Sequence, residues 1–301
     1  MTSRRTAVLV TVVAVLVLIA AGLIARHLEV PGSTTAPEAS PSASPAPAGG
    51  TAQVHLGDSF AAGTGLQPLV EGSPYPCLRA QGNFGQLLAE RFGRDLTDVS
   101  CAGATTDDLR GSQYDGTAPQ LDALSPRAEL VTLMLGGNDG DVYATAVGEC
   151  TRLGRTDPSG DPCRRAVGDT LLKRLDAQTR PALEEGLREV VRRAPNARVL
   201  IAGYPAILPA AGGCFGQVPI AAGDIAFMNR LQQRLNDVVE TAATAAGAAY
   251  VDLTEVSAGH DACAAPSQRW VEPVTGGPAS LHPNARGQRG IAAAVAARLA
   301  S

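Results

Sequence analysis

The sequence predicts an α/β fold built around a parallel sheet of about five strands. Short apolar or β-branched runs alternate along the chain with stretches of helical periodicity, the pattern of βαβ units. Of the 301 residues, 45% are hydrophobic, which is enough to bury a full core. The formal net charge of -4 lacks the basic footprint of a nucleic-acid-binding protein, so no nucleic-acid partner is expected.

Five short runs are expected to form the strands, and the longer periodic stretches between them the helices. The predicted strands are 52–56, 96–99, 130–135, 198–202 and 249–253. The predicted helices are 83–92, 164–194, 225–246 and 284–300. In an open parallel sheet, ligands bind beyond the carboxyl ends of the strands, so the residues that follow each strand are the first candidates for a functional site.

The first fifty residues are expected to lie outside the catalytic domain. Arg4 and Arg5 precede an unbroken apolar run over 7–25, which as a helix would rise about 28 Å and span a bilayer. The run lacks a small-x-small cleavage site, so residues 1–30 are predicted to form a cytoplasmic tip and an uncleaved membrane anchor. Secretion after signal cleavage is the alternative. Residues 31–50 are rich in Pro, Ser and Ala and predict a linker, which leaves 51–301 as the domain.

Six cysteines lie within the predicted domain: Cys77, Cys101, Cys150, Cys163, Cys214 and Cys263. None has a spacing typical of a zinc site, so no metal and no cofactor are predicted. An even number of cysteines in an exported domain predicts three disulfides, for which fifteen connectivities are possible. We favour the pairing in sequence order, Cys77 with Cys101, Cys150 with Cys163 and Cys214 with Cys263.

Four short motifs lie at predicted strand ends or at the start of the last predicted helix. They are Gly57-Asp58-Ser59, Gly103, Gly136-Gly137-Asn138-Asp139 and His282. Each alone has an ordinary structural explanation, such as a helix cap, a turn or a solvated histidine. In this order and placement, the motifs resemble the four blocks of the SGNH hydrolases, also called the GDSL lipase/esterase superfamily. The resemblance covers residues 51–300.

This resemblance implies a flavodoxin-like SGNH fold, which is a three-layer α/β/α sandwich, and a serine esterase or lipase. It implies Ser59 as the nucleophile, His282 as its base, and Ser59, Gly103 and Asn138 as the oxyanion hole. The chemistry of these residue types agrees, because an attacking serine needs a base within hydrogen-bond reach and donors aimed at the developing oxyanion. Gly103 can bring its backbone N–H close because it lacks a Cβ, and Asn138 offers a neutral amide donor.

His282 is the best candidate base among the four histidines. The proline that follows it can occupy the first position of the last predicted helix, so the imidazole would lie at the positive helix end, where protonation is disfavoured. His27 adjoins the predicted anchor and His55 lies within the first predicted strand. His260, in a loop, is the one serious rival.

One position departs from the family pattern. Members of the superfamily commonly carry an aspartate three residues before the catalytic histidine, and Ala279 occupies that place. Either a main-chain carbonyl of 278–280 orients His282 and the enzyme is a dyad, or a carboxylate elsewhere does so. The candidate carboxylates are Asp252, Asp261 and Glu272.

The substrate is predicted by class only. The loop around Cys77 and segments 141–163 and 208–223 would border the strand ends, and 208–223 is apolar enough to contact an acyl chain, although such loops can equally serve to house the disulfides. An acyl ester cleaved by a lipase or esterase is the first choice. An O-acetyl ester of a cell-envelope polysaccharide is the second, and a non-catalytic SGNH-like binding module is the alternative from another class. We expect a monomeric catalytic domain at the outer face of the membrane.

Overall fold

A parallel five-stranded sheet lies at the centre of the protein, for which a computed structural model describes residues 52–275 and 279–301. The strands are β1 (Ala52–Gly57), β2 (Asp95–Asp98), β3 (Leu130–Met134), β4 (Arg198–Ala202) and β5 (Ala249–Val251). Their order across the sheet is β2-β1-β3-β4-β5. The chain thus turns from β1 to one edge and then returns to the other side of β1. The boundary between β1 and β3 is therefore the topological switch point at which such sheets bind ligands.

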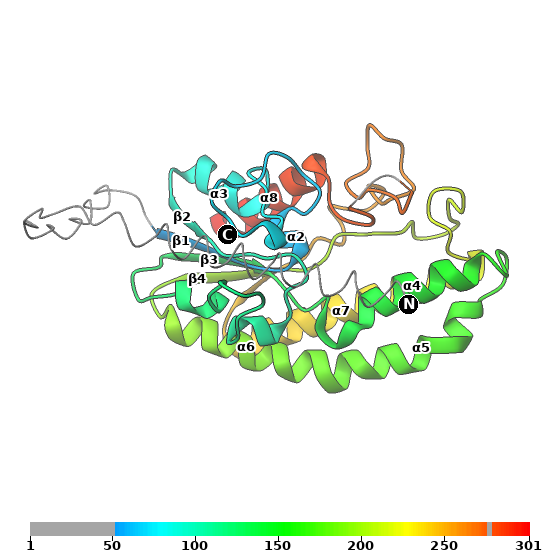
Figure 1. Ribbon diagram of the computed structural model, residues 1–301, viewed down its shortest axis with the longest axis horizontal. Coiled ribbons are helices and arrows are strands. Elements are labelled where there is room, and N and C mark those ends of the chain that lie inside the picture. The colour runs from blue at the N-terminus through cyan, green and yellow to red at the C-terminus, as the bar shows by residue number, and fades with distance from the viewer. Residues whose placement is uncertain (1–51, 276–278) are drawn as a thin grey trace, which may run out of the picture. The chain divides into compact units, whose positions relative to one another are not determined.

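Helices cover both faces of this sheet (Figure 1). On one side lie α3 (Phe84–Phe92) and α8 (Ala285–Ala300), which pack against each other. On the other side lie four helices: α4 (Val142–Gly154), α5 (Pro162–Arg174), α6 (Arg180–Arg193) and α7 (Ile225–Ala246). The predicted α/β sandwich around a parallel sheet is confirmed.

The predicted helix over 164–194 is wrong as a single element. A π-helical turn over Leu175–Thr179 separates α5 from α6. Pro181, in the first turn of α6, has no N–H to donate, so the regular helical hydrogen-bond ladder cannot continue through this point. The other predictions are close: β4 and α7 have the predicted bounds, and the remaining strands differ from prediction by at most about two residues at either end.

The helix α4 lies in a segment that the sequence predicts as a loop. Gly148 in its middle lowers the intrinsic helix propensity. Tertiary contacts hold the helix in place: a disulfide joins Cys150 to Cys163 in the first turn of α5, and the last residue, Gly154, lies against 219–221. A Cβ at Gly154 would be 2.6 Å from the carbonyl oxygen of Pro219, so only glycine allows this approach.

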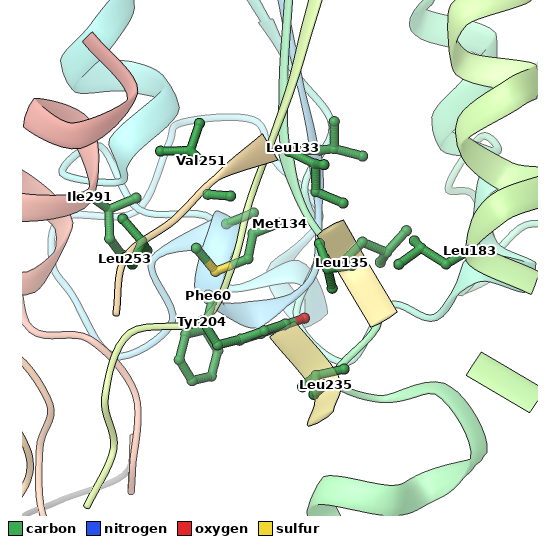
Figure 2. Close-up of a cluster of buried hydrophobic side chains, with 14 of the residues drawn as sticks. Phe60, Leu133, Met134, Leu135, Leu183, Tyr204, Leu235, Val251, Leu253 and Ile291 are labelled. Atoms are coloured by element: carbon green, nitrogen blue, oxygen red, sulfur yellow. The ribbon is translucent and has the colours of Figure 1, made fainter. Parts of the chain in front are cut away.

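The hydrophobic core continues beyond the carboxyl ends of the strands. Every residue of β3 is buried, as expected for a central strand of a parallel sheet. Figure 2 shows Met134 and Leu135, at the end of β3, in the same buried cluster as Phe60 and Tyr204. The loops at this edge therefore rest on close-packed side chains, which restrict their movement.

His55 is a structural residue in the middle of β1. Its ring is fully buried, with Nε2 3.1 Å from the carbonyl oxygen of Ala61 and Nδ1 2.9 Å from Oγ1 of Thr132. Burial lowers the pKa of His55, so the ring is neutral. Each ring nitrogen faces a carbonyl oxygen, Nε2 that of Ala61 and Nδ1 that of Thr132 at 3.1 Å, so the nitrogen that carries the proton has an acceptor in either tautomer. His55 thus ties the short helix after β1 to the sheet and is not available as a base.

The six cysteines form three disulfides, joined in sequence order. Cys77 bonds to Cys101, Cys150 to Cys163 and Cys214 to Cys263, with sequence separations of 24, 13 and 49. The first disulfide links the segment after β2 to a 3₁₀ turn over Tyr75–Cys77. All three disulfides join segments that lie outside the strands.

No helix within 52–275 and 279–301 is both long and apolar enough to cross a bilayer. The predicted anchor over 7–25 and the predicted linker over 31–50 lie outside these described residues.

Replacing each disulfide pair by alanines tests how far loop closure stabilises the domain. The loop-entropy relation gives about 3 kcal/mol for the Cys150–Cys163 loop and about 4 kcal/mol for the Cys214–Cys263 loop. We expect the melting temperature to fall least for the Cys150/Cys163 variant and most for the Cys214/Cys263 variant, by calorimetry. The reverse order would show that the burial of Cys150 and Cys163, both fully inaccessible, outweighs loop length.

Candidate active site

Ser59 begins a short helix, α2 (Ser59–Ala62), directly after β1. Asp58 caps this helix, since its Oδ1 accepts the N–H of Phe60 at 2.9 Å. Gly57 has a φ of 127°, and a Cβ there would lie 2.2 Å from the carbonyl oxygen of Met134 on β3. The glycine therefore allows the sharp turn that presents the Ser59 hydroxyl at the edge of the sheet.

His282 lies against Ser59 although 223 positions separate them in the sequence. Its Nε2 is 2.8 Å from Oγ of Ser59, and its Nδ1 is 2.8 Å from the carbonyl oxygen of Ser280. A carbonyl oxygen only accepts, so Nδ1 carries the proton and Nε2 of the neutral ring accepts from the Ser59 hydroxyl. Burial lowers the pKa of His282 from its ordinary value of 6.5, which keeps the ring neutral near pH 7.

The backbone between these two contacts has an unusual conformation. Leu281 has a φ of 58°, in the left-handed region that a branched side chain rarely adopts. This turn brings the carbonyl of Ser280 back toward the ring of His282. The Leu281 side chain is buried, and its N–H donates to the carbonyl oxygen of Glu272 at 2.8 Å, which holds the turn in place.

The three candidate carboxylates bind other groups. Asp252 accepts the N–H of Thr254, and Asp261 accepts that of Cys263. Glu272 pairs with Arg269 at 2.8 Å and accepts from the side chain of Asn284 at 2.9 Å. Within the described residues, Nδ1 of His282 therefore donates to a main-chain carbonyl and not to a carboxylate.

The other two predicted oxyanion-hole residues lie in the segments that follow β2 and β3, the strands on either side of β1. Gly103, with a φ of 80°, follows β2, and Asn138 follows β3. The Asn138 side chain donates to the carbonyl oxygen of Ala104 at 2.9 Å, which restrains the amide while its second N–H stays available. The backbone N–H groups of Ser59 and Gly103 make no hydrogen bond within the described part of the chain. Ser59 and Asn138 both line the cavity beside the serine, whereas Gly103 is not among its lining residues.

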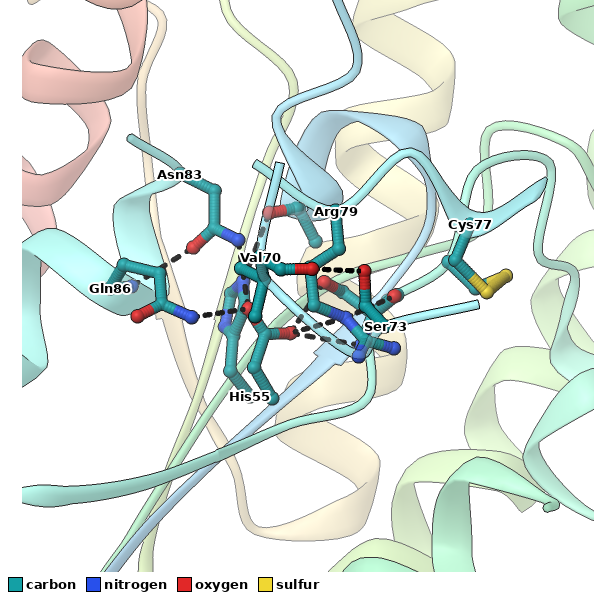
Figure 3. A network of polar contacts seen from close by, with 12 residues as sticks. His55, Val70, Ser73, Cys77, Arg79, Asn83 and Gln86 are labelled. Carbon is teal, nitrogen blue, oxygen red and sulfur yellow. Dashed lines mark hydrogen bonds and ion pairs between the residues drawn. A yellow bond between two sulfur atoms is a disulfide. The ribbon is translucent and has the colours of Figure 1, made fainter. Parts of the chain in front are cut away.

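A buried polar network supports the segment that carries Gly103 (Figure 3). Asp98, at the end of β2, lies 3.3 Å from Nε of Arg79, which also donates to the carbonyl oxygen of Ser100 at 3.0 Å. The side chains of Asn83 and Gln86 donate to the other carboxylate oxygen of Asp98. The network joins α3 and the loop before it to the chain that leads to Gly103.

A second tie holds the Gly103 segment to the Asn138 turn. Asp139 is buried, and its Oδ1 accepts the N–H of Thr106 at 3.0 Å and the hydroxyl of Thr106 at 2.6 Å. Burial raises the pKa of Asp139 to about 6, and the bonds from Thr106 oppose this shift. These two hydrogen bonds fasten the Gly103 segment to the Asn138 turn.

A small cavity opens beside Ser59 and His282, with a volume of about 190 Å³. Its wall away from the polar groups is apolar and comes from α4, α7 and the chain after β4: Tyr143, Ala144, Val147, Leu235 and Tyr204. The expectation that 208–223 contacts an acyl chain is not met at this cavity, because Leu208 and Ala210 line a second cavity, which shares Tyr204 with the first. Helix α4 takes that place because its disulfide to α5 holds it over the strand ends.

Segment 141–163 was expected to border the strand ends, and α4 within it does line the cavity, although the sequence did not predict a helix there. Tyr204 was not predicted as a site residue. It follows β4 within two residues, so the rule that sites lie at strand ends could have found it. His260, the rival base, stacks on Trp270 with ring centroids 5.0 Å apart and takes no part in the cavity. His27 lies outside the described residues.

Comparisons with known proteins agree with this arrangement. The model of the GDSL-like lipase/acylhydrolase family matches residues 55–289. Lipase 2 of Streptomyces coelicolor is 45% identical over 244 residues, which cover 79% of this chain and 82% of that protein. A lipase of Streptomyces rimosus is 29% identical over 241 residues, covering 79% of this chain and 82% of that protein.

Among solved structures, phospholipase A1 from Streptomyces albidoflavus superimposes with a TM-score of 0.71 and 27% identity, covering 83% of this chain and 99% of that one. The extracellular lipase from Streptomyces rimosus superimposes with a TM-score of 0.69 and 25% identity, covering 82% and 99%. The family match spans the motifs after β1, β2 and β3 as well as His282. The chain therefore belongs to the GDSL-like lipase/acylhydrolase family, within the SGNH hydrolase superfamily, and is a carboxylic ester hydrolase.

Proposed function

We propose that this protein cleaves carboxylic acyl esters by a Ser-His mechanism with an acyl-enzyme on Ser59. The observation that carries the proposal is the 2.8 Å contact between Oγ of Ser59 and Nε2 of His282 at the mouth of an apolar cavity. A serine within hydrogen-bond reach of a neutral, oriented imidazole is the arrangement that activates the hydroxyl for attack.

The reaction proceeds in two halves. Oγ of Ser59 attacks the ester carbonyl carbon as its proton passes to Nε2 of His282, and the imidazolium then protonates the departing alcohol. Water attacks the acyl-enzyme in the second half, again giving a proton to His282, which returns it to Ser59 as the acid leaves. The carbonyl dipole of Ser280 holds the tautomer of the ring and stabilises the transient imidazolium at 2.8 Å.

The oxyanion that forms in each half would bind the backbone N–H groups of Ser59 and Gly103 and the side-chain amide of Asn138. Ser59 is the first residue of α2, and the N–H groups of the first helical turn have no acceptor within the helix. The N–H of Ser59 is therefore available to the oxyanion. Donors that are in place before the reaction stabilise the developing charge without reorganisation.

The shape of the cavity favours an acyl chain over a simple acetyl group. A volume of about 190 Å³ holds about six heavy atoms, because a water occupies about 30 Å³ in the liquid and a methylene group is of similar size. Tyr143, Val147 and Leu235 line this space with apolar surface. An acetyl group would leave most of this space unfilled, which argues against the polysaccharide deacetylase alternative.

We also propose that the domain acts outside the cytoplasm. Three disulfides support export, since such bonds persist in oxidising compartments. The solved lipase of Streptomyces rimosus is described as extracellular. Retention at the outer face of the membrane through 7–25 stays a prediction from the sequence.

The variant Ser59→Ala removes the proposed nucleophile. We expect hydrolysis of p-nitrophenyl esters to fall to the level of a blank, with an unchanged circular dichroism spectrum, because no other group near His282 can form the acyl-enzyme. Asn138→Ala is expected to cost about 10² to 10³ in kcat, the range for one oxyanion-hole donor. Wild-type turnover in a Ser59→Ala preparation free of contaminating esterase would disprove the assignment.

Substitution of the carboxylates separates the dyad from a triad. His282→Ala should be nearly inactive, while Asp252→Asn, Asp261→Asn and Glu272→Gln should each keep kcat/KM within about tenfold, because none of them bonds to the ring. For the wild type, kcat/KM should rise with pH and level off, with the acid limb below pH 6.5, since burial lowers the pKa of His282. A loss of about a thousandfold in one folded carboxylate variant would identify an orienting acid.

A series of p-nitrophenyl esters tests the acyl site. Each methylene buried in the cavity contributes about 0.8 kcal/mol, so kcat/KM should rise up to about fourfold per methylene until the chain reaches about six to eight carbons, and then level off. Val147→Phe should move this break to shorter chains. Val256→Phe, at a half-exposed position outside the cavity, is the matched control.

Two outcomes would contradict the acyl-site assignment. Turnover of acetyl esters alone would favour the deacetylase. Absence of turnover with every ester would favour the binding module.

A further inference from the structure

The hydroxyl of Tyr204 lies between the segment that carries Ser59 and the turn that carries Asn138. It accepts the N–H of Gly137 at 2.8 Å and donates to Oδ2 of Asp58. Gly137 precedes Asn138, and Asp58 precedes Ser59. One buried side chain just after β4 therefore connects the two loops that follow β1 and β3.

Burial raises the pKa of Asp58 to about 7, and in the ionised form of this carboxyl both oxygens can only accept, which fixes the direction of each hydrogen bond in this chain. The N–H of Gly137 can only donate, so the oxygen of Tyr204 accepts there, and its single proton goes to Asp58. Oδ1 of the same carboxyl accepts the N–H of Phe60 at 2.9 Å, at the start of α2. Both carboxyl oxygens are thus acceptors, and the chain runs without a break from the Asn138 turn to the cap of the serine helix.

Tyr204 is itself held rigidly. Its N–H donates to Oδ1 of Asn236 at 2.8 Å, and its carbonyl oxygen accepts from Nδ2 of Asn236 at 3.0 Å. Its ring packs edge-on against Phe60, with centroids 5.1 Å apart, and Figure 2 shows the two residues in one buried cluster. The approach on the other side is also close, because a Cβ at Gly137 would lie 2.9 Å from the Tyr204 oxygen.

We propose that Tyr204 is a positioning residue that keeps the amide of Asn138 in register with the hydroxyl of Ser59. The proposal rests on the ester-hydrolase mechanism above. The hydroxyl does not reach the ester, and it acts by setting the separation of the two loops that carry reacting groups. Displacement of a catalytic group by about 1 Å can cost about a hundredfold in rate, so loss of this link should appear in the chemical step.

The variant Tyr204→Phe removes the hydroxyl and keeps the ring that lines the cavity. We expect kcat to fall about 10- to 100-fold with KM within about twofold of wild type, because substrate contacts are retained and only the geometry of the transition state is impaired. Tyr250→Phe on β5 is the matched control, since that ring lies outside the Ser59 cavity, and it should keep wild-type kcat.

A double-mutant cycle separates positioning from a general effect on the fold. In an Asn138→Ala background, Tyr204→Phe should lower kcat by no more than about threefold, because the donor that Tyr204 positions is already absent. A purely structural role predicts the same loss in both backgrounds. Equal losses, an unchanged kcat in Tyr204→Phe, or a change in KM alone would each overturn the proposal.

A second variant keeps the test decisive. If Tyr204→Phe does not fold, Asp58→Ala removes the acceptor at the other end of the link and should show the same fall in kcat at constant KM; wild-type kcat in that variant would overturn the proposal. Failure of the proposed function is recognised separately, because the wild type would then be inactive or Ser59→Ala would keep its turnover.

Discussion

The parallel pairing of β1 with β3 is the constraint on which the active site depends. Gly57 and Met134 are register partners, and the pairing extends one residue further through the N–H of Asp58 and the carbonyl of Met134 at 3.0 Å. Parallel strands end at the same edge of a sheet, so Ser59 and Asn138 emerge side by side. The glycine at 57 permits this closeness, because any side chain there would collide with β3. The site is thus built on the most deeply buried part of the sheet.

In the proposed mechanism the base, His282, is oriented by a main-chain carbonyl, and this has a mechanistic consequence. A carbonyl oxygen selects the tautomer of His282 as well as a carboxylate does, but it brings only a dipole to the imidazolium and not a full charge. Burial of the ring disfavours the charged form further. In compensation, the turn at Leu281 holds the carbonyl of Ser280 in place, so little reorganisation is needed when the proton arrives.

Buried polar contacts and disulfides hold the loops at the edge of the sheet in place, as side-chain packing does in the core. Aromatic residues make up only 4% of the chain, so large apolar side chains are scarce for anchoring loops. The Asp98 network, the Thr106–Asp139 bonds and the Cys77–Cys101 disulfide instead hold the segments around Gly103. Each loop that would supply a donor to the proposed oxyanion hole is therefore restrained by a buried group, in agreement with the need for donors that are in place before reaction.

The sequence by itself determined the sheet, most of its helices and the family, because strand periodicity and the motifs at strand ends are local signals. It also located Ser59, Gly103, Asn138 and His282 as candidates through the order of those motifs. It did not predict α4, where a disulfide and backbone packing outweigh propensity, or the break between α5 and α6, where Pro181 interrupts the helical hydrogen bonds. It left open which group orients His282. Tyr204 meets Asp58 across 146 positions, and His282 meets Ser59 across 223. Only the tertiary structure could decide these contacts and the apolar cavity beside them, because the partners come from separate elements whose placement depends on how the whole sheet and its helices pack.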